Sequence, residues 1–101
     1  MATDRLPNPE LRRLRAAAQR LPAALKVGKA GLSPQFIQGL DEALRRRELI
    51  KVRFDEFKQQ KKELARELAE RTSSHLVMQV GHVVVLYRKR DSEGALPSAR
   101  S

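Results

Sequence analysis

Apolar side chains recur along this chain with two periods, and the change from one period to the other predicts an alternation of helices and strands. From residue 10 to 21, Leu and Ala return every three or four positions, which is typical of one face of a helix. Pro22 favours an end to that helix, because proline lacks an N–H. In residues 23–27 the period becomes two, with Lys26 on the polar side, so we expect a half-buried strand.

The same succession then repeats. Ser33 is a suitable N-cap and Pro34 suits a first helical position, so a second helix is expected to begin there. Residues 49–54 alternate again, with apolar side chains on one face and with Lys51 and Arg53 on the other. The second predicted strand therefore carries a basic face.

The last third of the chain predicts one more helix and a hairpin. Helical spacing extends over about residues 58–72, and two apolar strands follow at 76–80 and 83–87. Gly81 and His82 separate these strands, and glycine at the first central position suits a type II′ turn. The final strand is apolar on both faces, which indicates an interior place in the sheet.

The element order α-β-α-β-α-β-β predicts an α/β fold of the α+β type, a two-layer sandwich with a four-stranded mixed sheet. The parallel crossovers are expected to be right-handed. Residues 10–90 form the predicted domain. Residues 1–9, with two prolines and no periodicity, are expected to be a flexible arm, and the polar residues 91–101 a flexible tail.

Length and composition narrow the function classes. A chain of 101 residues with 41% hydrophobic residues suffices for one modest core. The absence of cysteine excludes disulfides, thiolate nucleophiles and cysteine-bound metals. No apolar run approaches the ~20 residues of a membrane-spanning helix, and the first residues lack the apolar core of a secretory signal. We expect a cytoplasmic monomer without cofactor or metal.

Charge gives the first functional indication. The formal net charge is +9, which favours a polyanionic partner, nucleic acid before an anionic membrane surface or an acidic protein. Positive charge gathers in residues 10–20, with four Arg against one Glu, and in residues 88–101, with four cations against two acids. Catalysis is not expected, because His75 and His82 lack metal-ligand spacing and no nucleophile–base arrangement is visible.

A loop between the first strand and the second helix, Gly28-Lys29-Ala30-Gly31, is the main candidate for binding chemistry. Two glycines let the backbone approach a phosphate closely, where a Cβ would obstruct it. We expect the amide groups of the loop and of the first turn of the following helix to face the anion. Lys29 adds a full charge at the tip of the loop.

Three further cations extend this candidate site if the first two strands turn the same face to solvent. These are Lys26, Lys51 and Arg53. Phe36 and Phe54 fall on predicted core faces and Tyr87 on a strand end, so no platform for reading bases is expected. The predicted mode is salt-sensitive recognition of the phosphate backbone.

Three segments in this order resemble the CRM domain, named for chloroplast RNA splicing and ribosome maturation. They are residues 25–33 around the glycine loop, residues 48–52, and Gly81 followed by Val85-Leu86-Tyr87-Arg88. The resemblance covers about residues 10–90. Within this family, the chain resembles the bacterial YhbY-like proteins, which have a single domain. One departure is Thr72-Ser73-Ser74, where family members often have a glycine.

The resemblance implies a fold like the C-terminal domain of the third bacterial translation initiation factor. It also implies an RNA-binding protein without catalytic activity, which docks on ribosomal RNA of the precursor large subunit during ribosome assembly. The glycine loop is the family's proposed RNA contact, and Arg12 and Arg13 are added here as extensions. The complete candidate set is Lys26, Gly28, Lys29, Ala30, Gly31, Lys51, Arg53, Arg12 and Arg13.

Other functions remain open at this point. The basic surface could serve a protein-binding adaptor with an acidic partner, and plant relatives with several such domains imply a role in intron-RNA splicing. DNA binding is less favoured, because a strand separates each pair of predicted helices and leaves no helix-turn-helix. Membrane-surface binding is least favoured, because no helix pairs an aromatic-rich face with a basic one.

Overall fold

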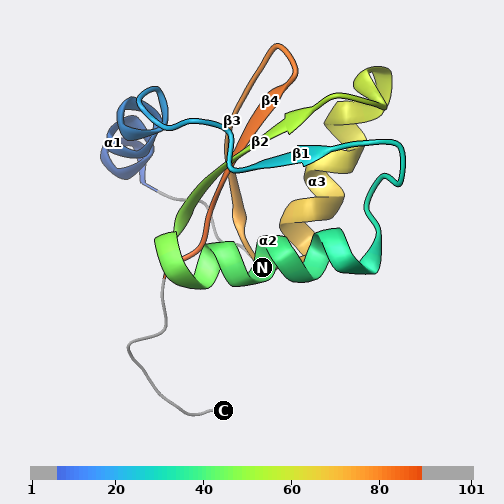
Figure 1. The fold of residues 1–101 in the computed structure, drawn as a ribbon. Coiled ribbons are helices and arrows are strands. Elements are labelled where there is room, and N and C mark those ends of the chain that lie inside the picture. Colours follow the sequence, from blue (N-terminus) through green and yellow to red (C-terminus); the bar gives the residue numbers. More distant parts are fainter. Residues whose placement is uncertain (1–6, 90–101) are drawn as a thin grey trace.

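A computed structural model describes residues 7–89 of the chain. The predicted tail, 91–101, and the first six residues of the predicted arm, 1–9, lie outside the described residues. The elements are α1 (Asn8–Ala18), β1 (Leu25–Val27), α2 (Pro34–Arg47), β2 (Leu49–Phe54), the short 3-10 helix η1 (Lys58–Gln60), α3 (Lys61–Arg71), β3 (His75–Val80) and β4 (Val83–Tyr87) (Figure 1). Apart from η1, this is the predicted order.

The four strands form one mixed sheet in the order β1-β2-β4-β3. β1 and β2 are parallel, whereas β4 is antiparallel to both β2 and β3. The expected interior place of the last strand is confirmed, because Val84, Val85 and Leu86 are all buried. Gly81 begins the β3–β4 turn with φ of 58°, the positive value that a type II′ turn requires there.

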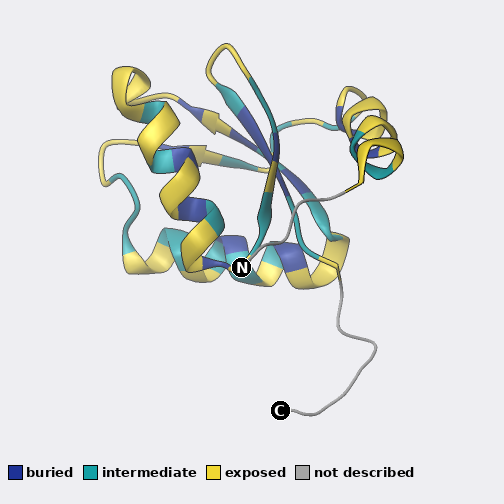
Figure 2. Ribbon diagram, turned by 180° about the vertical axis from the view of Figure 1, so that it is seen from behind, coloured by how far each residue is buried: buried dark blue, intermediate teal, exposed yellow. Residues whose placement is uncertain are grey.

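α2 and α3 cover one face of the sheet. Leu40 and Leu44 of α2, together with Ala65 and Leu68 of α3, pack on inward residues of β1, β2 and β4 in a single core. Both helices are crossovers between parallel strands, and both crossovers advance in the same direction across the sheet. Two crossover connections of the same handedness therefore place both helices on the same face of the sheet. Figure 2 shows the buried positions gathered in the central strands and on the inner sides of these helices.

α1 packs on part of the opposite face. Its buried residues, Leu14 and Ala18, contact Val77 of β3 and Val85 of β4. Arg15 strengthens this contact, because its Nε donates to the carbonyl oxygen of Val77 at 3.2 Å. Val77 lies at the irregularity in the β3–β4 register and has no partner there, so the arginine supplies a hydrogen bond where the ladder is interrupted. The cluster around α1 includes no residue of β1, so α1 does not cover that edge of this face.

α1 lies further toward the N-terminus than predicted, Asn8–Ala18 instead of residues 10–21. Pro7 is the N-cap and Pro9 lies in the first turn, where helical N–H groups have no internal partner, so these prolines start the helix instead of preventing it. At the other end, residues before Pro22 leave the helical geometry. The N–H of Leu21 then donates to the carbonyl oxygen of Ala18 in a tighter turn, at 3.0 Å.

The end of α3 explains the unusual Thr72-Ser73-Ser74 segment. The N–H of Ser74 donates to the carbonyl oxygen of Ala69 at 2.8 Å, and the N–H of Ser73 to that of Glu70 at 3.3 Å. These two bonds define a Schellman motif. Ser73 occupies the left-handed position with φ of 54°, where glycine is usual. The turn therefore keeps its geometry with serine in place of glycine.

We predict that Ser73→Gly stabilises the protein. The left-handed conformation costs an L-residue roughly 1–2 kcal/mol, and the greater freedom of glycine in the unfolded chain offsets part of the gain. A net increase of about 1 kcal/mol corresponds to a rise of roughly 4–8 °C in the melting temperature, measured by calorimetry. Ser73→Ala is the matched control: it removes the hydroxyl, keeps the strain and should give no gain. An equal gain in both variants would contradict the explanation.

Candidate nucleic-acid interface

The loop after β1 is a tight turn. The N–H of Gly31 donates to the carbonyl oxygen of Gly28 at 3.0 Å, which places Lys29 and Ala30 at the tip. Gly28, Lys29 and Ala30 are exposed, whereas Gly31 is half-buried. Lys29 therefore lies at the exposed tip of the turn, as the sequence predicted.

The two glycines of this loop serve different purposes. Gly31 has φ of 66°, so the backbone conformation favours glycine there, and a Cβ would be in ordinary van der Waals contact with Cε2 of Phe57, at 3.4 Å. Gly28 lacks a positive φ, and a Cβ there would meet no atom within 4 Å. Nothing in the described residues requires glycine at position 28. The absence of a side chain there leaves an open approach to the backbone.

The tip of the turn offers free hydrogen-bond donors. Among the described residues, the N–H groups of Lys29 and Ala30 find no acceptor, and the Lys29 ammonium pairs with no carboxylate. The expected contribution from α2 is largely missing. Pro34 has no N–H, and the N–H of Phe36 already donates to Oγ of its N-cap, Ser33, at 3.1 Å. An anion at this loop would therefore be held mainly by the turn, because Pro34 and Phe36 of α2 offer no free N–H group.

The open part of the α1-facing side of the sheet carries the three predicted strand cations. Lys26 and Arg53 are direct neighbours in the parallel β1–β2 register, and Lys51 lies two positions before Arg53 on the same face. Lys26 makes no ion pair within the described part of the chain, whereas Arg53 donates from Nε to Oδ1 of Asp55 at 2.9 Å. The same-face arrangement expected from the sequence is confirmed, but part of the Arg53 charge is neutralised.

Lys51 borders a shallow hollow of about 310 Å³ between the end of α1 and the β3–β4 hairpin. Gln19, Met78, Val80 and Val83 complete its lining. Val80 is 62% exposed. This face therefore combines a cation with accessible apolar surface.

Arg12 and Arg13 are not brought to the glycine loop. α1 and the loop after β1 lie at opposite ends of the molecule in both ribbon views (Figures 1 and 2). Arg13 is in addition paired with Glu10, at 2.7 Å between Nη2 and Oε1. The two arginines and the loop could act together only on an extended ligand.

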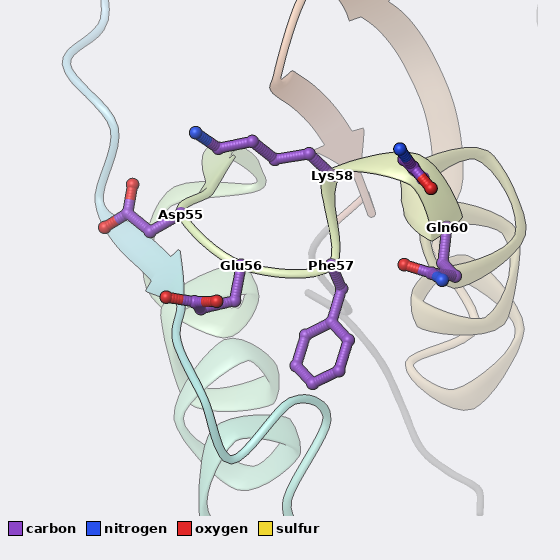
Figure 3. A pocket seen from close by; sticks show the side chains of 6 residues that line it. Asp55, Glu56, Phe57, Lys58 and Gln60 are labelled. Carbon is purple, nitrogen blue, oxygen red and sulfur yellow. The ribbon is translucent and has the colours of Figure 1, made fainter.

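Sequence reasoning missed the residues of the β2–α3 connection. The N–H groups of Asp55 and Glu56 both donate to the carbonyl oxygen of Val27, at 3.0 and 3.1 Å, which holds this connection beside the end of β1. Phe57 then projects toward the glycine loop, and Lys58 extends on the other side of the connection (Figure 3). The available signal was an aromatic residue outside any apolar period, in an otherwise polar segment.

Tyr87 and His75 have structural roles. Tyr87 packs with the α1 cluster and stacks on His75, with ring centroids 6.4 Å apart. Burial, together with nearby Glu48 and Glu10, raises the pKa of Tyr87, so the phenol is neutral near pH 7. In residues 7–89, no three His, Cys, Asp or Glu side chains gather into a group that could hold a metal ion. None of the described helices is long and apolar enough to cross a membrane.

Arg88 corrects the interpretation of the basic C-terminal segment. Its guanidinium donates to Oδ1 of Asp41 at 2.7 Å, to the carbonyl oxygen of Asp41 at 3.0 Å and to that of Thr72 at 2.7 Å. The side chain is only 22% exposed. This cation therefore joins α2 to the end of α3 and is not part of a solvated basic tail.

Comparison with known proteins agrees with this architecture. The chain is 36% identical over 77 residues to the "Probable RNA-binding protein YqeI" of Bacillus subtilis, which covers 75% of this chain and 80% of the relative. It is 34% identical over its whole length to the "CRM-domain containing factor CFM3, chloroplastic/mitochondrial" of Zea mays, but spans only 12% of that protein. The solution structure of SAV1595 from Staphylococcus aureus superimposes with a TM-score of 0.73 at 37% identity, covering 86% of this chain and 92% of the other.

The family-level comparison covers nearly all of the described domain. The sequence profile of the CRS1 / YhbY (CRM) domain matches residues 6–88, from the start of α1 through the end of β4. The matched range includes the glycine loop, the basic strands and Arg88. This chain therefore belongs to the CRS1 / YhbY (CRM) domain family.

Proposed function

We propose that this chain binds RNA through the glycine loop, with the cations of the adjoining sheet face extending the contact. The observation that carries the proposal is Gly28, an exposed glycine that neither backbone conformation nor packing requires, next to an unpaired lysine. A phosphate group there would accept hydrogen bonds from the N–H groups of Lys29 and Ala30 and face the Lys29 ammonium. The name of the Bacillus subtilis relative, "Probable RNA-binding protein YqeI", supports the same ligand class.

The narrower proposal is a non-catalytic role on ribosomal RNA of the precursor large subunit, in the cytoplasm. It rests on the resemblance to the bacterial YhbY-like members of the family and on the similarity to the Bacillus subtilis relative, of which this chain spans 80%. Ribosomal RNA offers the dense phosphate charge that a chain of +9 attracts.

Ultraviolet crosslinking in cells, followed by sequencing of the attached RNA, tests this assignment. We expect discrete crosslinks in large-subunit ribosomal RNA, enriched in precursor particles. Crosslinks concentrated in intron RNA would replace ribosome assembly with splicing. Scattered or absent crosslinks, together with a salt-independent interaction in vitro, would favour a protein adaptor, because release of counterions marks phosphate contacts.

Alanine substitutions at the two glycines of the loop distinguish an effect on RNA binding from an effect on stability. We predict that Gly28→Ala leaves the melting temperature unchanged, since its Cβ enters open space, but weakens RNA binding roughly tenfold by blocking one backbone–phosphate hydrogen bond. Gly31→Ala should instead lower the stability by about 1–2 kcal/mol because of its positive φ. Calorimetry and fluorescence anisotropy with labelled RNA check both values. Full RNA affinity in a folded Gly28→Ala protein would remove this loop from the binding site.

A further inference from the structure

We propose that Phe57 is a stacking site for an unpaired nucleobase, beside the phosphate site of the glycine loop. The inference rests on the proposed function, because it names the part of the RNA that the same loop would hold. It also changes the expected mode of binding: the chain would engage a single-stranded segment and not only the phosphate backbone of a helix.

The first observation is an exposed aromatic ring that its own backbone does not favour. Phe57 is 41% exposed and has φ of 57°, in the left-handed region that bulky residues rarely adopt. Such strain persists only where the surrounding structure fixes it, and it gathers at binding sites. The bonds from the N–H groups of Asp55 and Glu56 to Val27, together with that from Gln60 to the carbonyl oxygen of Phe57, fix it here.

The second observation is the place of the ring. Cε2 and Cζ of Phe57 lie 3.4 and 3.7 Å from the position that a Cβ of Gly31 would take, so the aromatic edge meets the backbone of the glycine loop. Lys29 lies two residues away in that loop, at the tip of the turn. A nucleotide whose phosphate binds this tip would therefore have an aromatic surface within reach of its base.

The third observation is the hollow beside the ring. The hollow has a volume of about 270 Å³ and is lined by Gly31, Leu32, Phe57 and Leu64. Glu67 and Arg71 complete the lining and form an ion pair, with 3.1 Å between Oε2 and Nη1. A nucleobase has apolar faces and a polar rim, so it fits a site with an aromatic and aliphatic lining and hydrogen-bonding groups beside it. Phe57 also lines a second hollow of about 430 Å³, formed by residues 55–60 (Figure 3).

The charges near Phe57 favour a base over a second phosphate. Asp55 and Glu56 directly precede the ring and would repel a phosphate. Asp55 is already paired with Arg53, whereas Lys58, on the following residue, makes no ion pair among the described residues. A nucleobase carries no charge, so it can lie between these carboxylates and the cationic loop without electrostatic repulsion from either.

The test uses the full chain and two probes of equal length, a single-stranded oligoadenosine and an abasic ribose-phosphate strand. We expect the unaltered protein to bind oligoadenosine roughly tenfold more tightly than the abasic strand. Phe57→Leu, which keeps an apolar side chain at the same backbone position, should abolish this preference while binding the abasic strand normally. Lys29→Glu should weaken binding of both strands alike.

A tryptophan variant supplies an independent measurement. The chain contains no Trp, so Phe57→Trp introduces a single indole whose fluorescence should be quenched by oligoadenosine and not by the abasic strand. Leu76→Trp is the matched control: Leu76 is similarly exposed, at 38%, but belongs to β3 at the opposite edge of the sheet from β1. Its fluorescence should be insensitive to either strand.

The outcomes separate the two proposals. Equal affinity for both strands, or an unchanged preference in Phe57→Leu together with no quenching in Phe57→Trp, would overturn the stacking site while leaving RNA binding at Lys29 in place. Failure of the unaltered protein to bind either strand would overturn the stacking site and the proposed function together.

Discussion

Lys29→Glu is expected to weaken RNA binding roughly ten- to a hundredfold without loss of the fold. The Lys29 side chain lies at the exposed tip of the Gly28–Gly31 turn and makes no ion pair within residues 7–89, so folding does not depend on it. Hydrogen bonds to charged groups are worth about 1.5–3 kcal/mol, and tenfold in affinity corresponds to about 1.4 kcal/mol. A carboxylate at the same place would also repel the phosphate. Fluorescence anisotropy with single-stranded ribosomal RNA fragments measures the change.

Salt dependence distinguishes the loss of a phosphate contact from a general change of charge. Removing one contact with a single strand should lower the slope of log affinity against log salt by about 0.7. Lys89→Glu changes the net charge by the same amount and is the matched control. Lys89 lies at the other end of α2 from the glycine loop. The N–H of the preceding residue, Arg88, donates to the carbonyl oxygen of Glu48 at the C-terminal end of α2, whereas the glycine loop precedes the N-terminal end of that helix. Equal losses in both variants would show that only net charge matters and would contradict a site at Lys29.

Arg88→Ala should have the largest effect on stability. The substitution removes three hydrogen bonds from a guanidinium that joins α2 to the end of α3, and it leaves the carbonyl oxygen of Thr72 without this donor. Because the side chain is 22% exposed and water replaces part of the loss, we expect a decrease of about 2–3 kcal/mol. For a domain of this size, the melting temperature would fall by roughly 10–20 °C. Calorimetry provides the measurement.

Arg45→Ala is the appropriate comparison for Arg88. Arg45 pairs with the same aspartate, at 2.9 Å between Nη2 and Oδ2, but is 71% exposed. An exposed helix pair of this spacing contributes about 0.3–0.5 kcal/mol, so its loss should shift the melting temperature only slightly. RNA affinity measured well below the melting temperature should be unchanged in both variants. Similar melting temperatures for Arg88→Ala and Arg45→Ala would contradict the structural role of Arg88.

Most elements of the fold could be predicted, because their signals are local. The period of two in residues 49–54 fixes which side chains enter the core, and burial of Ile50, Val52 and Phe54 confirms that prediction. The Ser33 cap was predicted from residue type and is confirmed by its bond to Phe36. The predicted start of α1 was wrong, because proline suits the first turn of a helix as well as an irregular arm, and Pro7 and Pro9 mark the helix start here, as Pro34 does for α2.

The candidate site could be predicted only in part from local sequence signals. The glycine loop is a continuous segment, so its exposure and the position of its lysine at the tip could be predicted from neighbouring residues. The different reasons for Gly28 and Gly31 could not, since they depend on the backbone φ at each position and on what a Cβ there would meet. Likewise, the start of α2 offers fewer free N–H groups than the sequence predicted, because Pro34 has none and the N–H of Phe36 donates to the Ser33 cap.

The sequence by itself determined the order of the elements, the apolar and basic faces of β2 and the glycine turn, because each depends on residues a few positions apart. The high positive charge follows from composition alone. Only the tertiary structure decided which distant residues meet. Parallel pairing of β1 with β2 sets Lys26 beside Arg53, and the bonds of Asp55 and Glu56 to Val27 bring Phe57 to the glycine loop. Packing of α2 and α3 on one sheet face makes the partly buried Arg88 a link between α2 and the end of α3. Contacts of this kind depend on strand register and helix placement, which no local pattern encodes.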